Sequence, residues 1–117
     1  MIFGVSSTLS ALGALDTKTA VRAHNVANTS SDGFKKSRPV LEEGPGGTVR
    51  ARVSKVETPG PLLPVQGEEG MEIREGSNVD LTEEIPDLML TRRHFEANLK
   101  IIQTDDEMLG SLLDIVG

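Results

Sequence analysis

One stretch decides the fold: residues 81–116, LTEEIPDLMLTRRHFEANLKIIQTDDEMLGSLLDIV. Its apolar residues recur at alternating steps of four and three, and only Arg92 and Asp106 interrupt the series. A period of 3.5 residues keeps one stripe facing a partner along a whole helix, which is typical of a coiled-coil surface. We call this stripe the seam, and it comprises Leu81, Ile85, Leu88, Arg92, Phe95, Leu99, Ile102, Asp106, Leu109, Leu113 and Val116.

A helix of this length needs a partner. Roughly 35 residues at 1.5 Å each make a helix about 50 Å long, which a compact domain of this size cannot cover. A second helix is expected over Ile2–Asn28, where the same stepping recurs more weakly at Val5, Leu9, Leu12, Asp16, Thr19, Ala23 and Val26. We therefore expect each helix to be packed, either antiparallel within the chain or swapped with a neighbouring copy.

The sequence indicates the end of the first helix more clearly than its start. Its start is open, because Ser6, Ser7, Thr8 or Ser10 could each serve as N-cap. Its end is clearer, because residues 28–33 are a cluster of turn formers. There Asn28 is expected in a left-handed position and Gly33 at positive φ.

The second helix begins among cap candidates and acidic residues. Asp80 and Glu83 have the spacing of a capping box, and acidic residues complement the positive end of the helix dipole. Pro86 should kink the helix if Asp80 is the cap, and costs less if Thr82 is the cap. We expect a frayed or bent first turn, with the continuous helix running from about Asp87 to Ile115.

The middle of the chain is β-rich rather than helical. Residues 39–70 contain five of the six prolines and several glycines. Within the middle, residues 48–57 alternate Val or Ala with Arg or Lys, and residues 71–75 form a second alternating run. We expect a two- or three-stranded β element that leans on a helix, since a lone hairpin is marginal in water.

These elements predict a fold that is mainly α with a small β element. Long N-terminal and C-terminal helices would pair as a coiled coil around a short β-rich middle. The expected divisions are residues 1–38, 39–76 and 77–117.

Composition excludes several classes of function. The 117 residues allow one domain at most, and the lack of cysteine excludes disulfides and thiol chemistry. Nucleic acid is a poor partner for a chain with a pI of about 4.8. No apolar run reaches the ~18 residues of a membrane span. The first fifteen residues lack Lys and Arg, so no secretory signal peptide is expected.

Charge is unevenly placed along the chain. The net charge is +3 over residues 1–38, zero over residues 39–67 and −9 over residues 68–117, within a total of −6. A basic first helix and an acidic last helix can steer pairing with each other or between copies. The alternative is an acidic face that is simply solvated.

No group of residues forms a catalytic, cofactor or metal site. His24 and His94 are the two histidines, and they lie in different helices without the spacing of zinc ligands. Residues 105–107 are consecutive acids that fan around a helix axis. The hydroxyls of residues 6–8 have no adjacent base, and the glycines of residues 44–47 lack the context of a phosphate loop. The prediction is that the chain is not an enzyme.

Two motifs resemble those of bacterial flagellar rod and hook axial proteins. The first comprises residues 25–29, NVANT, followed by residues 32–37, DGFKKS. The second comprises residues 77–84, SNVDLTEE, followed by residues 92–98, RRHFEAN, and residues 102–109, IQTDDEML. Both occur in the family's order. The matching motif residues are Asn25, Asn28, Gly33, Phe34, Asn78, Asp80, Ala97 and Asn98.

The resemblance implies a structural role. Proteins of this family stack helically with themselves and with other axial proteins in the periplasmic rod or in the hook. They leave the cell through the flagellar type III export apparatus without a cleaved signal peptide. An alternative is a helical interaction module or adaptor of the same family that no longer polymerises. Concentration-dependent fibres would separate the two.

The residues expected to pair helices or copies are Leu9, Leu12, Leu81, Ile85, Leu88, Phe95, Leu99, Ile102, Leu109 and Leu113. Asn25 and Asn28 could contact other subunits or satisfy backbone groups at the helix end. Arg92 could reach Asp16 if the helices run antiparallel.

Overall fold

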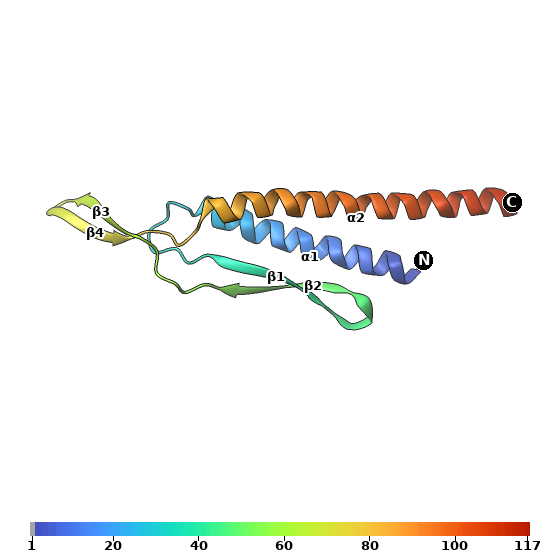
Figure 1. Ribbon diagram of the computed structural model, residues 1–117, viewed down its shortest axis with the longest axis horizontal. Coiled ribbons are helices and arrows are strands. Elements are labelled where there is room, and N and C mark those ends of the chain that lie inside the picture. The colour runs from blue at the N-terminus through green and yellow to red at the C-terminus, as the bar shows by residue number, and fades with distance from the viewer. Residues whose placement is uncertain (1) are drawn as a thin grey trace.

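The computed structural model describes the backbone of residues 2–117 and the side chains of residues 4–117. The elements follow in the order α1 (Ile2–Ala27), β1 (Ser37–Glu43), a 3-10 turn η1 (Pro45–Gly47), β2 (Val49–Lys55), β3 (Leu62–Gly67), β4 (Gly70–Glu75) and α2 (Leu81–Val116). The hairpin β1–β2 lies along α1, and the hairpin β3–β4 projects beyond the helix pair (Figure 1). The predicted fold class, two long terminal helices around a β-rich middle, is confirmed.

The molecule is a rod rather than a globule. Its principal extents are 81 × 24 × 19 Å and its radius of gyration is 20.9 Å, whereas a compact domain of this length would have a radius of about 13 Å. Among the described side chains, the buried apolar ones are Ala14, Leu15 and Pro39. The fold therefore has almost no apolar core.

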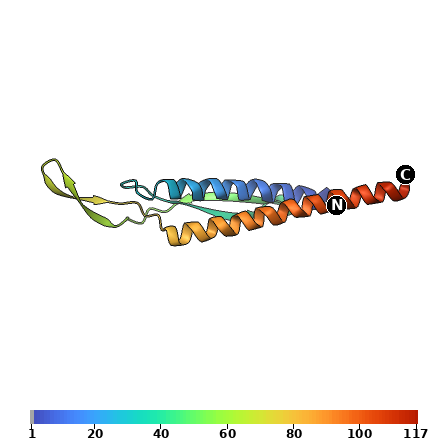
Figure 2. The ribbon, with the colours of Figure 1, turned by 90° about the horizontal axis from the view of Figure 1, so that it is seen from above.

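The two helices run antiparallel within one chain. Arg22, near the end of α1, bonds to Glu84 and Asp87 near the start of α2. The expectation of an antiparallel, packed pair is confirmed in its intrachain form. Because α2 has 36 residues and α1 has 26, α2 continues past the start of α1 (Figure 1). Viewed from above, the helices cross at a shallow angle (Figure 2).

The N-cap candidates proposed for α1 are wrong. The helix already begins at Ile2, so the proposed N-cap residues lie inside it. The Thr8 hydroxyl donates to the Gly4 carbonyl at 2.8 Å, one turn back. The Ser10 hydroxyl instead accepts the Val49 N–H at 3.0 Å and so links α1 to β2.

The end of α1 was predicted in part. Gly33 has φ of +68°, as expected. Among the residues with described backbone, no residue other than glycine has positive φ, so the left-handed position predicted for Asn28 is wrong. The Asn28 side chain satisfies the helix end instead, because its Nδ2 donates to the His24 carbonyl at 2.9 Å.

The start of α2 corrects two expectations. Asp80 is the N-cap, and its carboxylate accepts the Thr82 N–H at 3.0 Å. The reciprocal capping box is absent, because the Glu83 carboxylate pairs with Lys36 at 3.1 Å. The helix runs unbroken through Pro86, so the predicted delay until Asp87 is wrong. Proline removes one backbone hydrogen bond, to the carbonyl of the exposed Thr82, which water can satisfy.

The middle contains four strands in two antiparallel hairpins, not two or three strands. Strands at Val49–Lys55 and Gly70–Glu75 agree with the two alternating runs, whereas β1 and β3 were not predicted. Each of these missed strands contains a proline, Pro39 or Pro64. In a two-stranded sheet every strand is an edge strand, and a proline can sit there without losing a ladder bond. The first hairpin leans on α1, as expected.

Candidate assembly interface

A buried polar cluster joins the two helices; we call it the clasp. Arg22 Nη1 lies 3.1 Å from both carboxylate oxygens of Glu84, and Arg22 Nε lies 2.7 Å from Asp87 Oδ2. Lys18 Nζ reaches the other Asp87 oxygen at 3.2 Å. One guanidinium therefore bridges two acids that are three residues apart on α2.

Asn25 extends the clasp to the first hairpin. Its Nδ2 donates to the Ser37 carbonyl at 2.8 Å and to Glu84 Oε1 at 3.2 Å, and its Oδ1 accepts the Ser37 N–H at 3.0 Å. Asn25 and Glu84 are fully buried. Every buried side-chain N or O atom in the described residues has a partner. The clasp thus fixes α1, β1 and α2 relative to one another.

Asn78 organises the junction between the two hairpins. Its Oδ1 accepts the Lys36 N–H at 2.6 Å, and its Nδ2 donates to the carbonyls of Val56 at 2.8 Å and Thr58 at 2.9 Å. Its own N–H donates to the Phe34 carbonyl at 3.2 Å. One side chain therefore gathers three chain segments just before α2 begins.

Two acids near this junction, the half-buried Glu75 and the exposed Asp80, have lowered pKa values. A hydrogen bond from the Lys35 ammonium lowers the pKa of Glu75 below its ordinary value of 4.5, and the Gly60 N–H adds to the effect. The Thr82 hydroxyl, followed by the Thr82 N–H, lowers the pKa of Asp80 below 3.8. Both carboxylates are therefore stabilised in their ionised form.

Gly33 and Phe34 of the first motif lie around the same end of the rod. The Gly33 N–H donates to the Glu75 carbonyl at 2.9 Å. The Phe34 ring packs edge-on against His24, with ring centroids 5.5 Å apart. Farther along α2, Asn98 is half-buried and donates to the His94 carbonyl, whereas Ala97 is exposed.

The face that α2 turns toward α1 is rotated from the seam by roughly 50°, half of the step between successive helix residues. Leu88, Phe95 and Ile102 of the seam are half-buried there. Between them lie polar residues rather than the other seam residues: Glu84 and Thr91 are fully buried, and Asn98 and Asp105 are half-buried.

The rest of the predicted pairing residues remain open in the single chain. On α2 these are the exposed Leu81, Ile85, Leu99, Leu109 and Leu113. On α1, Leu9 is exposed and Leu12 is half-buried. The intrachain contact thus uses the polar flank of the seam and leaves much of its apolar part to solvent.

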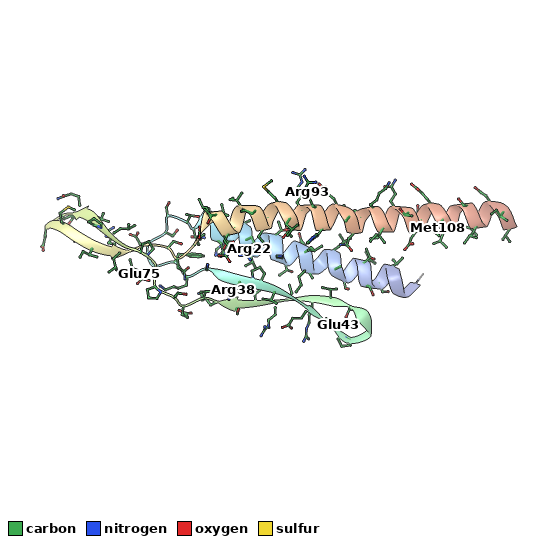
Figure 3. All side chains as sticks on the ribbon, in the orientation of Figure 1. Arg22, Arg38, Glu43, Glu75, Arg93 and Met108 are labelled. Atoms are coloured by element: carbon green, nitrogen blue, oxygen red, sulfur yellow. The ribbon has the colours of Figure 1, made fainter. Side chains whose placement is uncertain are left out.

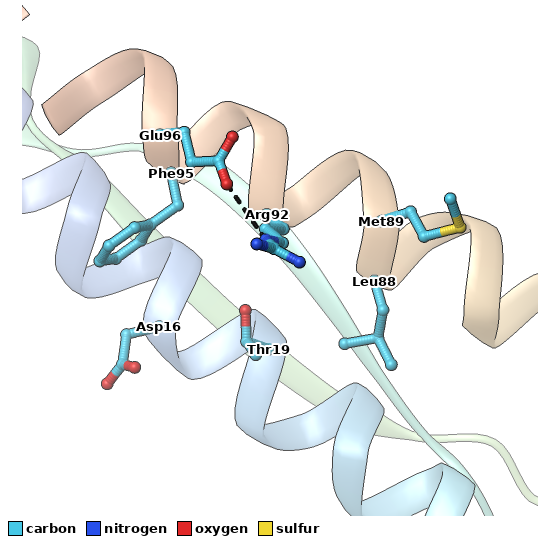
Figure 4. A pocket seen from close by; sticks show the side chains of 7 residues that line it. All are labelled: Asp16, Thr19, Leu88, Met89, Arg92, Phe95 and Glu96. Atoms are coloured by element: carbon cyan, nitrogen blue, oxygen red, sulfur yellow. Dashed lines mark hydrogen bonds and ion pairs between the residues drawn. The ribbon is translucent and has the colours of Figure 1, made fainter. Parts of the chain in front are cut away.

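A hollow of about 520 Å³ lies between the helices, with Leu88 and Phe95 on its α2 side and Thr19 on its α1 side (Figure 4). Arg92 and Asp16 both line it, but the Arg92 Nε bonds to Glu96 on its own helix at 3.1 Å. The structure therefore pairs Arg92 with Glu96 and not with Asp16.

The clasp residues Lys18, Arg22, Glu84 and Asp87 were missed by the sequence prediction. A signal was present, because bases four residues apart on α1 face acids three residues apart on α2. The uneven charge of the two helices predicted pairing in general but not which residues meet. In the described part of the chain no cluster of potential metal ligands occurs, and no helix is long and apolar enough to cross a membrane.

The architecture defines a class: an elongated subunit whose terminal helices pair through polar contacts and present open apolar stripes. Residues 70–115 match the family described as "Flagellar basal body rod FlgEFG protein C-terminal". Over this C-terminal segment the chain is therefore similar to the flagellar rod and hook family, and the match confirms the resemblance there. The prediction that the chain is not an enzyme agrees with this match.

Two relatives support the same assignment. The chain is 46% identical over 41 residues to the flagellar hook protein FlgE of Treponema pallidum (strain Nichols), and equally to the flagellar basal-body rod protein FlgG of Bacillus subtilis (strain 168). Each match covers 35% of this chain. It covers 9% of the hook protein and 16% of the rod protein, so the chain matches a small part of each relative.

Proposed function

We propose that the chain is a structural axial subunit of the flagellar basal-body rod, or of a rod- or hook-like assembly, and that it self-assembles through its terminal helices. The family match over residues 70–115 supports this role. The proposal also rests on the open seam, because an apolar stripe left uncovered within one chain needs a further partner.

The open seam carries the proposal. Leu81, Ile85, Leu99, Leu109 and Leu113 are between 42% and 71% exposed. Full burial of such a side chain contributes about 1.5–3 kcal/mol, so covering the exposed half of five contributes about 4–8 kcal/mol per subunit. That amount is comparable to the whole stability of a small domain. A head-to-tail contact that does not close extends such pairing into a helical filament.

The remaining parts of the role follow from the resemblance. The partners are other copies and other flagellar axial proteins, the location is the periplasmic rod, and the route is the flagellar type III export apparatus without a cleaved signal peptide. Residues 1–38 and 77–117 form the assembling part, and residues 39–76 face outward from it.

A second candidate is a non-polymerising interaction module or adaptor of the same family. The clasp favours it, because it already pairs the two helices within one chain and satisfies their buried polar groups. Such a subunit would bind one partner through its open seam rather than extend a filament.

The test is growth of assemblies with concentration, followed by sedimentation and negative-stain electron microscopy. Leu113→Glu places a charge on the seam and should abolish fibres. Leu62→Glu, in the projecting hairpin, is the matched control, because both leucines are 71% exposed. Fibres that persist in Leu113→Glu would refute the seam as the assembly surface. A parent chain that never forms fibres but binds one axial partner would favour the adaptor.

A further inference from the structure

The helix α2 carries a second apolar stripe, which we call the outer stripe: Leu90, Ala97, Ile101, Met108 and Ile115. All five side chains are exposed. At 100° per residue, the stripe lies about 110° around the axis from the face that contacts α1, and nearly opposite the seam. Neither the intrachain contact nor seam-mediated assembly covers it. Shallow hollows of about 370 and 440 Å³ lie along it, beside Ile101 and Met108.

The outer stripe fits a coiled-coil pattern. Positions 90, 94, 97, 101, 104, 108, 111 and 115 alternate in steps of four and three, with His94, Thr104 and Ser111 as the polar members. The stripe from Leu90 to Ile115 is therefore a candidate helix-pairing surface about 39 Å long.

The flank of this stripe has an ordered charge pattern. Arg93, Lys100, Glu107 and Asp114 recur every seven residues along one edge, first two bases and then two acids. Arg93 points away from α1 (Figure 3). Within residues 4–117 none of the four belongs to an ion pair. Lys100 and Glu107 each contact Gln103, at 3.3 and 3.0 Å.

We propose that the outer stripe binds the same stripe of a second copy of this chain, antiparallel, across a two-fold axis between residues 102 and 103. In antiparallel coiled coils each flank meets the same flank of the partner helix. Arg93 then faces Asp114 of the second copy, and Lys100 faces Glu107. The two-fold axis repeats both, which gives four ion pairs.

The same register also matches the stripe itself. Leu90 lies opposite Ile115 of the second copy, and the small Ala97 lies opposite the long Met108. Of the polar members, His94 lies opposite Ser111, whereas Thr104 lies opposite Ile101. Polar residues that face each other favour one register over others.

A parallel pair is less complementary. It would set this flank against the opposite edge of the partner's stripe, which carries Asn98, Asp105 and Leu112. Lys100 would then meet one acid, and Arg93 would meet none. Aligned helix dipoles also disfavour a parallel pair.

The size of the surface predicts a weak dimer. A strip about 39 Å long and about 10–12 Å wide covers roughly 400 Å² per copy, about half of a standard interface. The dimer should therefore depend on concentration and on salt. Because this contact is two-fold and closed, it goes beyond the proposed axial role and does not rest on it.

Disulfide trapping tests the orientation, because the chain has no cysteine of its own. Equal amounts of Ala97→Cys and Met108→Cys chains are mixed, oxidised and analysed by mass spectrometry. We expect a 97–108 disulfide in the mixture and little crosslinking of either variant alone. Disulfides of 97 with 97 and 108 with 108 would show a parallel pair and overturn the proposal, as would no crosslink in any sample.

Charge reversal tests the ion pairs. By light scattering at low ionic strength, Lys100→Glu should raise the dimer dissociation constant about tenfold or more, because two attractions become repulsions. Adding Glu107→Lys to the same chain should restore the parent value, since the reversed charges face each other in the second copy. Lys55→Glu, an equal charge change on the exposed strand β2, should leave it unchanged.

Each other outcome is decisive. A dimer that Lys100→Glu does not weaken, or that the double variant does not restore, overturns the proposal, as does a parent chain that stays monomeric. If Leu113→Glu removes fibres but keeps the dimer, the outer stripe acts independently of the seam. If fibres form without a 97–108 disulfide, the axial role stands and this inference fails.

Discussion

Arg22→Met should destabilise the subunit more than any other removal of a single charge. Among the described side chains, Arg22 is the one cation that contacts Glu84, and its side chain is 11% exposed while that of Glu84 is fully buried. The substitution keeps the length of the apolar stem but, within residues 4–117, leaves the Glu84 carboxylate with only the amide of Asn25. Asp87 suffers less, because it keeps Lys18 and is itself partly exposed.

The magnitude follows from the burial of the pair. Removing one partner of a buried ion pair costs about 3–5 kcal/mol, mostly because the other charge is left without compensation. Slight exposure of Arg22 places the expected loss near the lower end, about 3 kcal/mol, which is more than a hundredfold in the folding equilibrium. In a fold whose described buried apolar side chains are Ala14, Leu15 and Pro39, few other contacts offset this loss.

The assay is urea unfolding followed by far-UV circular dichroism. The double variant Arg22→Met/Glu84→Met should recover most of the loss, because replacing a whole buried pair by apolar groups is often nearly neutral. Arg52→Met is the control: its side chain is 65% exposed, it pairs with Glu42 at 2.7 Å, and it should cost less than about 1 kcal/mol. A loss below about 1 kcal/mol in Arg22→Met, or no recovery in the double variant, would refute the clasp as the main intrachain lock.

Three further predictions concern single positions. Gly60→Ala should destabilise the junction of the hairpins, seen as lower thermal stability, because its Cβ would overlap the Gly76 carbonyl oxygen. Lys35 lowers the pKa of Glu75 in the folded state. The Glu75 carboxylate therefore stabilises the fold fully at pH values above 4.5, its ordinary pKa, and this stabilisation is lost as the pH falls through the lower pKa of the folded state. Glu75→Gln should therefore flatten the acid limb of a pH-stability curve, and an unchanged limb would contradict it. Pro86→Ala should raise the unfolding free energy by about 1–3 kcal/mol in urea titrations, since it restores a helix hydrogen bond; no change would mean that the ring causes no strain there.

The sequence predicted the helices because their signal is long and periodic. The apolar repeat extends over 36 residues, and the helix forms through Pro86. The predicted delay of the helix start by this proline was therefore wrong. The strands β1 and β3 were missed for the opposite reason. Both strands are short, and each contains a proline. Proline destabilises a strand in the centre of a sheet but not one at its edge.

The periodicity of the sequence does not predict the clasp. Periodicity identifies the apolar stripe of a helix but not which helix will cover it, or at which rotation. Here the face of α2 that contacts α1 is rotated by roughly 50° from the seam, so that Glu84 and Thr91 are buried instead of Ile85 and Arg92. The choice depends on the pairing of Arg22 with two acids across more than sixty residues of sequence, which no local pattern encodes.

The division between a polar intrachain contact and open apolar stripes has a consequence for assembly. Apolar contacts are weakly directional, so an α1 that covered the seam through leucines would compete with any neighbouring copy for that surface. A guanidinium fork between two carboxylates is directional, and it holds α1 on the flank of the seam while leaving the leucines open. Folding and assembly then depend on different residues. Variants of Arg22 should lower the free energy of unfolding while the folded chain still self-associates. Variants of Leu113 should abolish self-association without lowering the free energy of unfolding.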